Sequence, residues 1–251
     1  MIDMFDLKGK NAMITGASQG LGKGMAIGLA KAGANIIIVD LKVPSEVIKE
    51  IKSYNVYCYG YEFNLRDFDS YDSLIEKINN ECGHIDILIN NAGVQKRSKS
   101  EEFPRDDWEF VMDINCNAVF YMCQKVGKLM LEKGYGKIIN MASMLSFQGG
   151  YTVPAYAAAK GAVATFTKSL SNEWASRGVN VNCIAPGYMA TTMNTQIIDD
   201  KNRNKQILER IPANRWGKPE DLAGTAVFLS SHASDYINGY IIAVDGGWLG
   251  R

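Results

Sequence analysis

Three residues of this 251-residue chain have the types and spacing needed to exchange a proton with an alcohol or a ketone. Ser143 follows an apolar segment, and Tyr156 and Lys160 are four residues apart in Tyr-Ala-Ala-Ala-Lys. Side chains at positions i and i+4 share one face of a helix, so the Lys160 ammonium can approach the Tyr156 phenol. We expect this cation to lower the tyrosine pKa from about 10 toward about 7, which would make Tyr156 a general acid and base. Ser143 would hold the substrate oxygen.

Taken alone, such a pair is usually a surface feature of an amphipathic helix, but a glycine-rich segment earlier in the chain adds a second motif. Residues 15–22 read Thr-Gly-Ala-Ser-Gln-Gly-Leu-Gly and connect an apolar segment to a helical pattern. Glycine allows the backbone to approach a pyrophosphate closely, and the positive end of a helix attracts that anion. The spacing is G-x-x-x-G-x-G rather than G-x-G-x-x-G, and it predicts a dinucleotide loop. Its members are Gly16, Ser18, Gln19, Gly20, Leu21 and Gly22.

Asp40 bears on the choice of cofactor. It ends the second apolar segment, where a carboxylate can accept hydrogen bonds from the ribose hydroxyls of NAD and repel a 2′-phosphate. NAD is therefore favoured over NADP, although the nearby Lys42 could weaken this preference. The alternative is an aspartate that only begins a turn.

Further cofactor contacts are predicted where later apolar segments end. Asn90-Asn91-Ala92-Gly93 can hold a loop along the adenosine side of the cofactor, and Pro186-Gly187 can place a turn against the nicotinamide. Each motif is also compatible with an ordinary turn. The predicted contacts are Asn91, Ala92, Gly93, Pro186, Gly187, Met189 and Thr191.

These motifs follow apolar segments that alternate with helical patterns, which is typical of βαβ units. Several segments are apolar at nearly every position, as expected for parallel strands covered on both faces. We predict an α/β fold: a single domain over residues 1–251, with a doubly wound, Rossmann-type sheet of seven parallel strands and helices on both faces. The predicted strands are 11–15, 35–40, 56–61, 85–90, 137–142, 179–185 and 240–244. Residues 188–212 lack a sustained pattern, and we expect them to be an irregular, mobile substrate lid.

Composition argues against several classes of function. The 27 basic and 27 acidic residues give no net charge, so no broad basic surface for nucleic acid is expected. The chain has no apolar run of the roughly 20 residues that a membrane span needs, and its first residues are acidic, unlike a signal peptide. The five cysteines are scattered without zinc-like spacing, so no metal site is predicted. We expect a cytoplasmic protein with reduced thiols and a small-molecule substrate.

Together, the motifs resemble the classical short-chain dehydrogenase/reductase family over essentially the whole chain. The glycine motif corresponds to residues 15–22, the Asn-Asn-Ala-Gly motif to residues 90–93, and the catalytic trio to Ser143, Tyr156 and Lys160. The resemblance implies that Asn115 is a fourth catalytic residue, which anchors a water that relays protons through Lys160. Without the family, Asn115 would be a helix asparagine satisfied by the backbone.

The resemblance has one visible departure on the adenine side of the cofactor. It implies cofactor contacts by Asn64 and Leu65, but the family usually has an aspartate where this chain has Asn64. Asparagine keeps an acceptor oxygen and loses the charge, so we expect a small effect on NAD affinity.

The loops near the substrate resemble those of family members that act on sugar acids. The likeness lies in residues 142–150, 185–191, 211–217 and 240–249. It implies NAD-linked interconversion of a keto-deoxy sugar acid and its diketo form, in the breakdown of pectin-type uronates. A sugar acid needs cations and hydroxyl partners. The predicted substrate contacts are Ser143, Tyr156, Arg97 and Gln148, with Lys96, Arg203 and Arg215 as weaker candidates.

Other functions remain open at this point. A reductase acting on gluconate at carbon 5 or on a 3-oxoacyl thioester would share all the catalytic residues. A non-catalytic NAD-binding sensor or scaffold is the alternative from another class, and it would be expected to have lost Tyr156 or Lys160, which are both intact.

Two segments predict an assembly. Residues 106–133 and 154–177 carry apolar side chains on more than one face, so both faces must be covered. In the family these helices pair with their copies in neighbouring subunits, which implies a homotetramer. The family likeness also favours a subunit interface for the C-terminal Trp248, with a core position as the alternative.

Overall fold

All seven predicted strands form, and they pair in one parallel sheet. The structure is a computed structural model that describes residues 3–251, and within that range the strand order is β3-β2-β1-β4-β5-β6-β7. The order reverses at β1 and β4, so the predicted doubly wound, Rossmann-type fold is confirmed. The strands end within two residues of the predicted positions. They are β1 (Asn11–Thr15), β2 (Asn35–Asp40), β3 (Cys58–Glu62), β4 (Ile87–Asn90), β5 (Gly136–Met141), β6 (Val179–Pro186) and β7 (Ile241–Val244).

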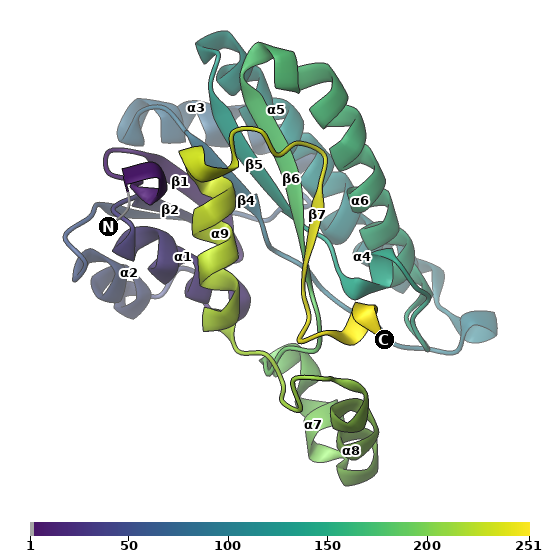
Figure 1. Cartoon of the computed structure of the whole chain (residues 1–251). Helices are drawn as coiled ribbons and strands as arrows, with labels where there is room; N and C mark the ends of the chain where they lie inside the picture. Colours follow the sequence, from purple (N-terminus) through teal and green to yellow (C-terminus); the bar gives the residue numbers. More distant parts are fainter. Residues whose placement is uncertain (1–2) are drawn as a thin grey trace.

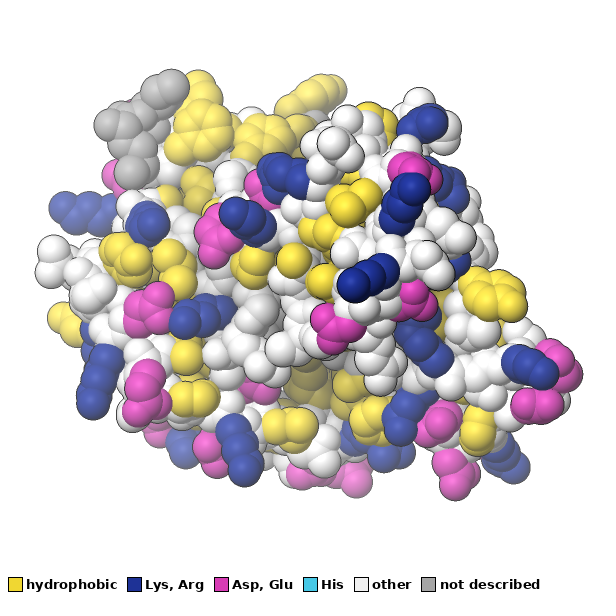
Figure 2. All heavy atoms as spheres, turned by 90° about the horizontal axis from the view of Figure 1, so that it is seen from below, with side chains coloured by type: hydrophobic (Ala, Val, Ile, Leu, Met, Phe, Trp, Pro, Cys, Tyr) yellow, Lys and Arg dark blue, Asp and Glu magenta, His cyan; other side chains and the backbone are white. Residues whose placement is uncertain are grey.

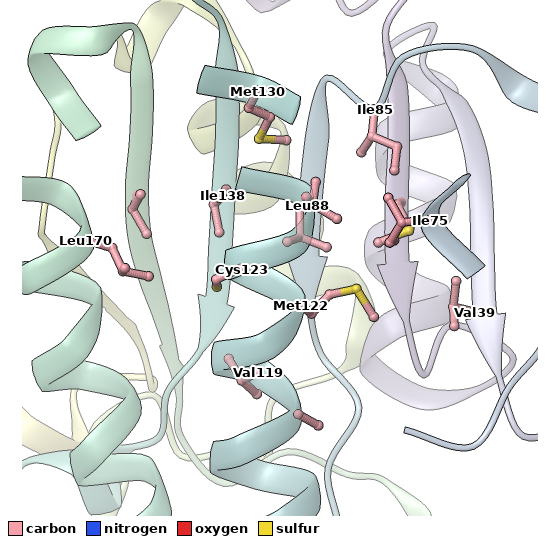
Figure 3. Close-up of a cluster of buried hydrophobic side chains, with 14 of the residues drawn as sticks. Val39, Ile75, Ile85, Leu88, Val119, Met122, Cys123, Met130, Ile138 and Leu170 are labelled. Carbon is pink, nitrogen blue, oxygen red and sulfur yellow. The ribbon is translucent and has the colours of Figure 1, made fainter. Parts of the chain in front are cut away.

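The central strands are almost wholly apolar because both faces of the sheet are buried. In β1, Ala12 and Ile14 belong to the core on one face, Met13 belongs to the core on the other, and all three are fully buried. Figure 3 shows the second of these layers, in which Leu88 of β4 lies close to Met122 of the covering helix. This two-sided burial is what parallel strands require.

Helices cover both faces of the sheet, as predicted. They are α1 (Gly20–Lys31), α2 (Ser45–Lys52), α3 (Tyr71–Cys82), α4 (Arg105–Met112), α5 (Ala118–Lys133), α6 (Pro154–Trp174), α7 (Thr195–Asp199), α8 (Lys201–Arg210) and α9 (Ala223–Ser230). Helix α1 packs with α2 and α9 on one face, and α3, α5 and α6 cover the other (Figure 1). A π-helical turn, Asp113–Asn117, joins α4 to α5 into the long helical segment expected there.

Residues 188–212 are not irregular, and this part of the prediction was wrong. They contain α7 and α8, which project beyond the carboxyl ends of the strands (Figure 1). The Asp200 carboxylate caps α8 by accepting hydrogen bonds from the amides of Asn202 and Arg203, each at 3.0 Å. Ile207 and Ile211 are buried beneath the helix. Capping and a small apolar contact therefore stabilise a helix whose sequence is mostly polar. Movement of this lobe as a lid stays a prediction.

The C-terminal tail packs its indole against residues of its own chain. Trp248 is only 5% exposed and stands edge-on to the Tyr188 ring, with 4.8 Å between ring centroids. Met144, Ile207 and Ile211 complete this small core. Trp248 therefore has a core position within its own chain, the alternative that the sequence left open, and a role of the tail at a subunit interface stays a prediction.

The surface and the cysteines add no further class of site. Figure 2 looks onto the face that includes the carboxyl ends of the strands, where basic and acidic side chains are interspersed. No helix within residues 3–251 is long and apolar enough to cross a membrane. The same residues contain no cluster of three or more His, Cys, Asp or Glu side chains that could hold a metal ion. All five cysteines are free thiols.

Candidate active site

A cleft of about 400 Å³ opens at the carboxyl ends of the strands. Its walls come from residues that end β2 and β6 or follow β1, β4 and β5. This edge, where the strand order reverses, is where open α/β sheets bind ligands. Most of the predicted site residues line the cleft: Gly16, Gln19, Gly20, Leu21, Asp40, Asn64, Leu65, Asn91, Ala92, Gly93, Ser143, Tyr156, Lys160, Pro186, Gly187, Met189 and Thr191.

The glycine loop is packed so tightly that side chains would not fit at two of its positions. A Cβ on Gly16, whose φ is +67°, would lie 2.8 Å from the Ala92 Cα. A Cβ on Gly22 would lie 2.2 Å from the Gly16 carbonyl oxygen. Gly22 thus lies behind the loop and not in the cleft wall. The Ser18 hydroxyl also points away, because it donates to the Lys42 carbonyl at 2.7 Å.

Asn91 and Thr15, the first residue of the glycine motif, whose role was not predicted, tie the glycine loop to the end of β4. The Asn91 side-chain amide donates to the carbonyls of Thr15 and Gly16, at 3.0 and 2.9 Å. In return, the Thr15 hydroxyl accepts hydrogen bonds from the amides of Asn91 and Ala92, at 3.0 and 3.1 Å. Thr15 is a polar residue that directly follows the apolar run of β1, and this change in polarity is the signal in the sequence that could have identified it.

Asp40 lies where the prediction placed it, at the end of β2 and in the cleft wall. One carboxylate oxygen accepts from the Ser18 amide at 3.0 Å, and the other accepts from the Leu41 amide at 2.8 Å. Each oxygen retains a lone pair, so the carboxylate can still accept a hydrogen bond from a ligand hydroxyl. The bond to the Ser18 amide, 22 residues away, fixes the carboxylate against the glycine loop.

Ser143 is held with its hydroxyl proton free. Its Oγ accepts from the Leu145 amide at 3.1 Å, while its own amide donates to the Ser146 hydroxyl at 3.2 Å. The Ser146 hydroxyl in turn donates to the Lys160 carbonyl at 2.7 Å. Because Ser143 accepts from the backbone, its O–H remains available for a substrate oxygen or for Tyr156.

The structure brings Tyr156 and Lys160 together but corrects the expected pKa of the phenol. Burial raises the pKa of Tyr156 above its usual range, and interaction with the Ser143 hydroxyl opposes that shift. The Lys160 Nζ lies 5.7 Å from the tyrosine ring centroid and donates to the Met141 carbonyl at 2.6 Å. Burial also lowers the pKa of Lys160 to about 8. The helix spacing was therefore sufficient to place the pair, but it could not reveal that burial raises the pKa of Tyr156 and lowers that of Lys160.

Asn115 is fully buried in the π-helical turn, where its amide holds the chain that follows β4. Its Nδ2 donates to the carbonyls of Val94 and Val111, both at 2.9 Å, and its Oδ1 accepts from the Val94 amide at 3.2 Å. The side chain is thus satisfied by the backbone, the interpretation that the sequence alone favoured. The water relay through Lys160 stays a prediction.

The two residues predicted to contact only the substrate, Arg97 and Gln148, do not line the cleft. Gln148 accepts a long hydrogen bond of 3.5 Å from Arg210 of α8. The Arg97 guanidinium donates to the Gln95 side chain at 3.0 Å. Of the weaker candidates, Arg215 forms a two-pronged pair with Asp221 and is thereby occupied.

Sequence reasoning missed mainly the apolar part of the cleft wall. Such residues give no chemical signal, because in a sequence they are indistinguishable from core positions. They line the cleft only because the fold leaves a space between the sheet and the π-helical turn. They are Val39, Leu41, Phe63, Val94, Phe110 and Ile114.

Comparison with known proteins assigns the chain to a family. The family model described as enoyl-(acyl carrier protein) reductase matches residues 16–249. The 2-dehydro-3-deoxy-D-gluconate 5-dehydrogenase of Dickeya dadantii (strain 3937) is 50% identical over 252 residues, which cover 100% of each chain. This chain belongs to the short-chain dehydrogenase/reductase family. The resemblance in its motifs is therefore confirmed.

Other members of this short-chain dehydrogenase/reductase family are similarly close. The 5-keto-D-gluconate 5-reductase of Escherichia coli (strain K12) is 42% identical, with 99% of each chain covered. The solved structure of a gluconate 5-dehydrogenase from Burkholderia cenocepacia J2315, in complex with NADP and tartrate, superposes with a TM-score of 0.95. It is 38% identical and covers 99% of this chain and 98% of its own.

The protein is thus an oxidoreductase of a family that uses a nicotinamide cofactor, and its cleft fits such a group. The glycine loop leaves backbone amides at the start of α1, where a pyrophosphate can approach. Asp40 lies at one end of the cleft lining, and Ser143, Tyr156 and Lys160 form the chemical end. The cleft can therefore hold a dinucleotide along the glycine loop and Asp40, and a small substrate beside Ser143, Tyr156 and Lys160.

Proposed function

We propose that the protein catalyses the NAD-linked oxidation of 2-dehydro-3-deoxy-D-gluconate to its diketo form, and the reverse reduction, in uronate and pectin breakdown. The observation that carries the proposal is the position of Ser143, Tyr156 and Lys160 at one end of a cleft whose other end is a dinucleotide cradle. The full-length identity of 50% to the Dickeya enzyme supports the sugar acid as substrate. The Burkholderia relative, a gluconate 5-dehydrogenase, likewise supports a sugar acid as substrate.

The chain supplies the proton chemistry of this reaction. When bound, a nicotinamide would supply the hydride acceptor for the carbinol carbon in the oxidation. Ser143 donates a hydrogen bond to the substrate oxygen, and Tyr156 takes the hydroxyl proton as the carbonyl forms. Lys160, with its pKa lowered to about 8, is still mostly protonated at neutral pH, so its charge favours the phenolate form of Tyr156. In the reduction each transfer runs backwards.

Initial rates over a panel of sugar acids test the substrate. We expect the highest kcat/KM with 2-dehydro-3-deoxy-D-gluconate, lower values with gluconate or 5-ketogluconate, and little activity with 3-oxoacyl thioesters. A thioester with a long chain would require a more apolar lobe than that of α7 and α8, which carries charged and amide side chains along residues 199–205. Preferred turnover of gluconate would support carbon-5 chemistry instead, and no turnover of any member would favour the sensor or scaffold.

We infer that NAD is preferred to NADP because the Asp40 carboxylate lies where a 2′-phosphate would have to fit. The Burkholderia relative binds NADP, so the preference for NAD over NADP has to be measured on this protein. In Asp40→Ala the ratio of kcat/KM for NAD to that for NADP should fall by about tenfold or more, since one repulsive charge is removed. An unmodified enzyme that already prefers NADP would contradict the inference.

We also propose that the protein is a homotetramer. Phe120, Tyr121 and Phe166 form an aromatic group at the outer side of α5 and α6, where the first two are 37% and 39% exposed. Strand β7 is apolar but only partly buried at the sheet edge. Both surfaces would be covered by copies of this chain. Light scattering after size exclusion should give about four times the 27.7 kDa chain mass, and a monomer mass would reject the proposal.

The free cysteines support a reducing compartment, in keeping with a cytoplasmic location. Cell fractionation would test this, and recovery of the protein outside the cytoplasm would oppose it.

A further inference from the structure

Ser146 makes two hydrogen bonds that join the segment carrying Ser143 to the helix carrying Lys160. Its Oγ accepts from the Ser143 amide at 3.2 Å, and its hydroxyl proton is donated to the Lys160 carbonyl at 2.7 Å. A serine hydroxyl has a single proton to donate, so this one is committed to the backbone. Ser146 differs in this respect from Ser143, whose O–H remains available. It can therefore position catalytic groups, but it cannot donate a hydrogen bond to the substrate oxygen.

A short 3₁₀ turn, Met144–Ser146, fixes Ser146 relative to Ser143. The two serines form a capping box, in which the Ser143 Oγ accepts from the Leu145 amide at 3.1 Å while the Ser146 Oγ accepts from the Ser143 amide. The Ser146 amide also donates to the Ser143 carbonyl at 2.9 Å. A movement of Ser146 must therefore carry the Ser143 hydroxyl with it.

The other side of the link is Lys160, which contacts the same segment a second time. Its Nζ donates to the Met141 carbonyl at 2.6 Å, while its own carbonyl accepts from Ser146. Tyr156 lies one turn earlier on α6. A bond to the backbone of Lys160 therefore fixes the position of α6, and with it the Tyr156 phenol, relative to the Ser143 hydroxyl.

The separation of the Ser143 and Tyr156 hydroxyls matters because both must reach the same substrate oxygen. The two groups come from different elements, since Ser143 follows β5 and Tyr156 belongs to α6. Displacement of a catalytic group by about 1 Å can lower a rate by about 100-fold. A side chain that connects the backbones of these two elements is therefore placed to influence the rate without touching the substrate.

We propose that Ser146 is a positioning residue, which sets the distance between the Ser143 and Tyr156 hydroxyls by joining the Ser143 amide to the Lys160 carbonyl. The proposal rests on the proposed function in taking these hydroxyls to exchange a proton with an alcohol or a ketone, but it does not depend on which sugar acid is used. Ser146 does not line the cleft, so loss of its hydroxyl should lower kcat and leave the dinucleotide cradle intact.

The test compares Ser146→Ala with Ser53→Ala. Ser53 donates to the Glu50 carbonyl at 2.6 Å on an exposed part of α2 outside the cleft wall, so it controls for the loss of a serine-to-carbonyl hydrogen bond. In Ser146→Ala we expect kcat with the best sugar acid to fall by about 10- to 100-fold, with the Kd for NAD changed by no more than about twofold. Ser53→Ala should change neither value. Ser146→Thr keeps the hydroxyl and should recover most of the lost kcat.

The pH dependence of kcat is a readout that a general loss of stability would not move. In the oxidation Tyr156 is the base, so kcat rises as the pH passes the pKa of the phenol. Burial raises that pKa, and the Ser143 hydroxyl opposes the shift. Of the groups around Lys160, burial raises the pKa of the Cys116 and Cys183 thiols, which therefore stay neutral.

Loss of the Ser146 hydroxyl weakens the contact that opposes the rise in the Tyr156 pKa. The rising limb of kcat against pH should therefore move to higher pH in Ser146→Ala, by about 0.5 to 1 pH unit for one weakened hydrogen bond. Ser53→Ala should keep the profile of the unmodified enzyme, and Ser146→Thr should restore it.

Hydrogen exchange measured by mass spectrometry separates this proposal from the proposed function, because it needs no substrate. The bond to Ser146 protects the Ser143 amide, so a fragment covering residues 142–147 should exchange about 2- to 10-fold faster in Ser146→Ala and at the unmodified rate in Ser53→Ala. Faster exchange supports the link even if no sugar acid in the panel is oxidised, a result that would reject the proposed function alone.

Three results would overturn the positioning role of Ser146. The first is an unchanged rate of exchange in Ser146→Ala, and the second is an unchanged kcat and pH profile. The third is a loss of kcat that comes with an equal loss of NAD affinity or that Ser146→Thr does not relieve, since Ser146 would then only stabilise the fold.

Discussion

Replacing Tyr156 by phenylalanine should lower kcat by about 10²- to 10⁴-fold, the range associated with loss of a general acid and base. The substitution removes only the hydroxyl that exchanges the proton and keeps the ring that lines the cleft. Steady-state rates with the best sugar acid measure the loss. Fluorescence titration should show that the Kd for NAD changes by no more than about threefold, because the binding contacts of the ring remain.

Tyr151→Phe is the matched control for this substitution. Tyr151 lies five residues earlier in the chain, just before α6, but is 82% exposed and outside the cleft wall, so removal of its hydroxyl should leave kcat unchanged. Equal activity of Tyr156→Phe and the unmodified enzyme would reject the catalytic role of the phenol. A parallel loss of NAD affinity and activity would assign Tyr156 to binding instead.

The behaviour of Tyr156 also marks what the sequence could and could not predict of the site. The i, i+4 spacing was enough to place Tyr156 and Lys160 on one helix face, since that geometry is local. The pKa of each group depends on solvent exclusion by segments far away in the chain, and burial moves both groups against their charged forms. No local pattern carries that information.

The fold was more predictable than the contacts that complete the site. Strand β1 was visible because burial on both faces requires consecutive apolar residues, here Ala12 to Ile14, and such a run is a pattern in sequence. Helix α8 was missed because it buries few residues, chiefly Ile207, although Asp200 before it is a recognisable N-cap. The clamp of Asn115 on Val94 could not be predicted, because it joins a π-helical turn to a loop 21 residues away.

Substituting alanine for Gly22 should abolish most cofactor binding, with an increase in the Kd for NAD of at least about tenfold. The added Cβ would lie 2.2 Å from the Gly16 carbonyl oxygen and 2.5 Å from the Asn91 side-chain nitrogen. Neither atom can move freely, because Asn91 bonds the carbonyls of both Thr15 and Gly16. The clash must therefore displace the loop whose backbone amides face the cleft, and overpacking of this kind typically costs about 1–3 kcal/mol of stability.

Two glycines provide the comparison that isolates this clash. Gly224 lies in α9 with no atom within 4 Å of an added Cβ, so Gly224→Ala should leave NAD binding unchanged and raise the free energy of unfolding slightly. Gly20 has a φ of +57° and open space around an added Cβ, so Gly20→Ala tests backbone strain without collision. Calorimetry with NAD and thermal unfolding measure both effects. If Gly22→Ala binds NAD as well as Gly224→Ala does, the loop can move more easily than its hydrogen bonds imply. The close packing of Gly22 against Gly16 and Asn91 would then not determine the shape of the cofactor site.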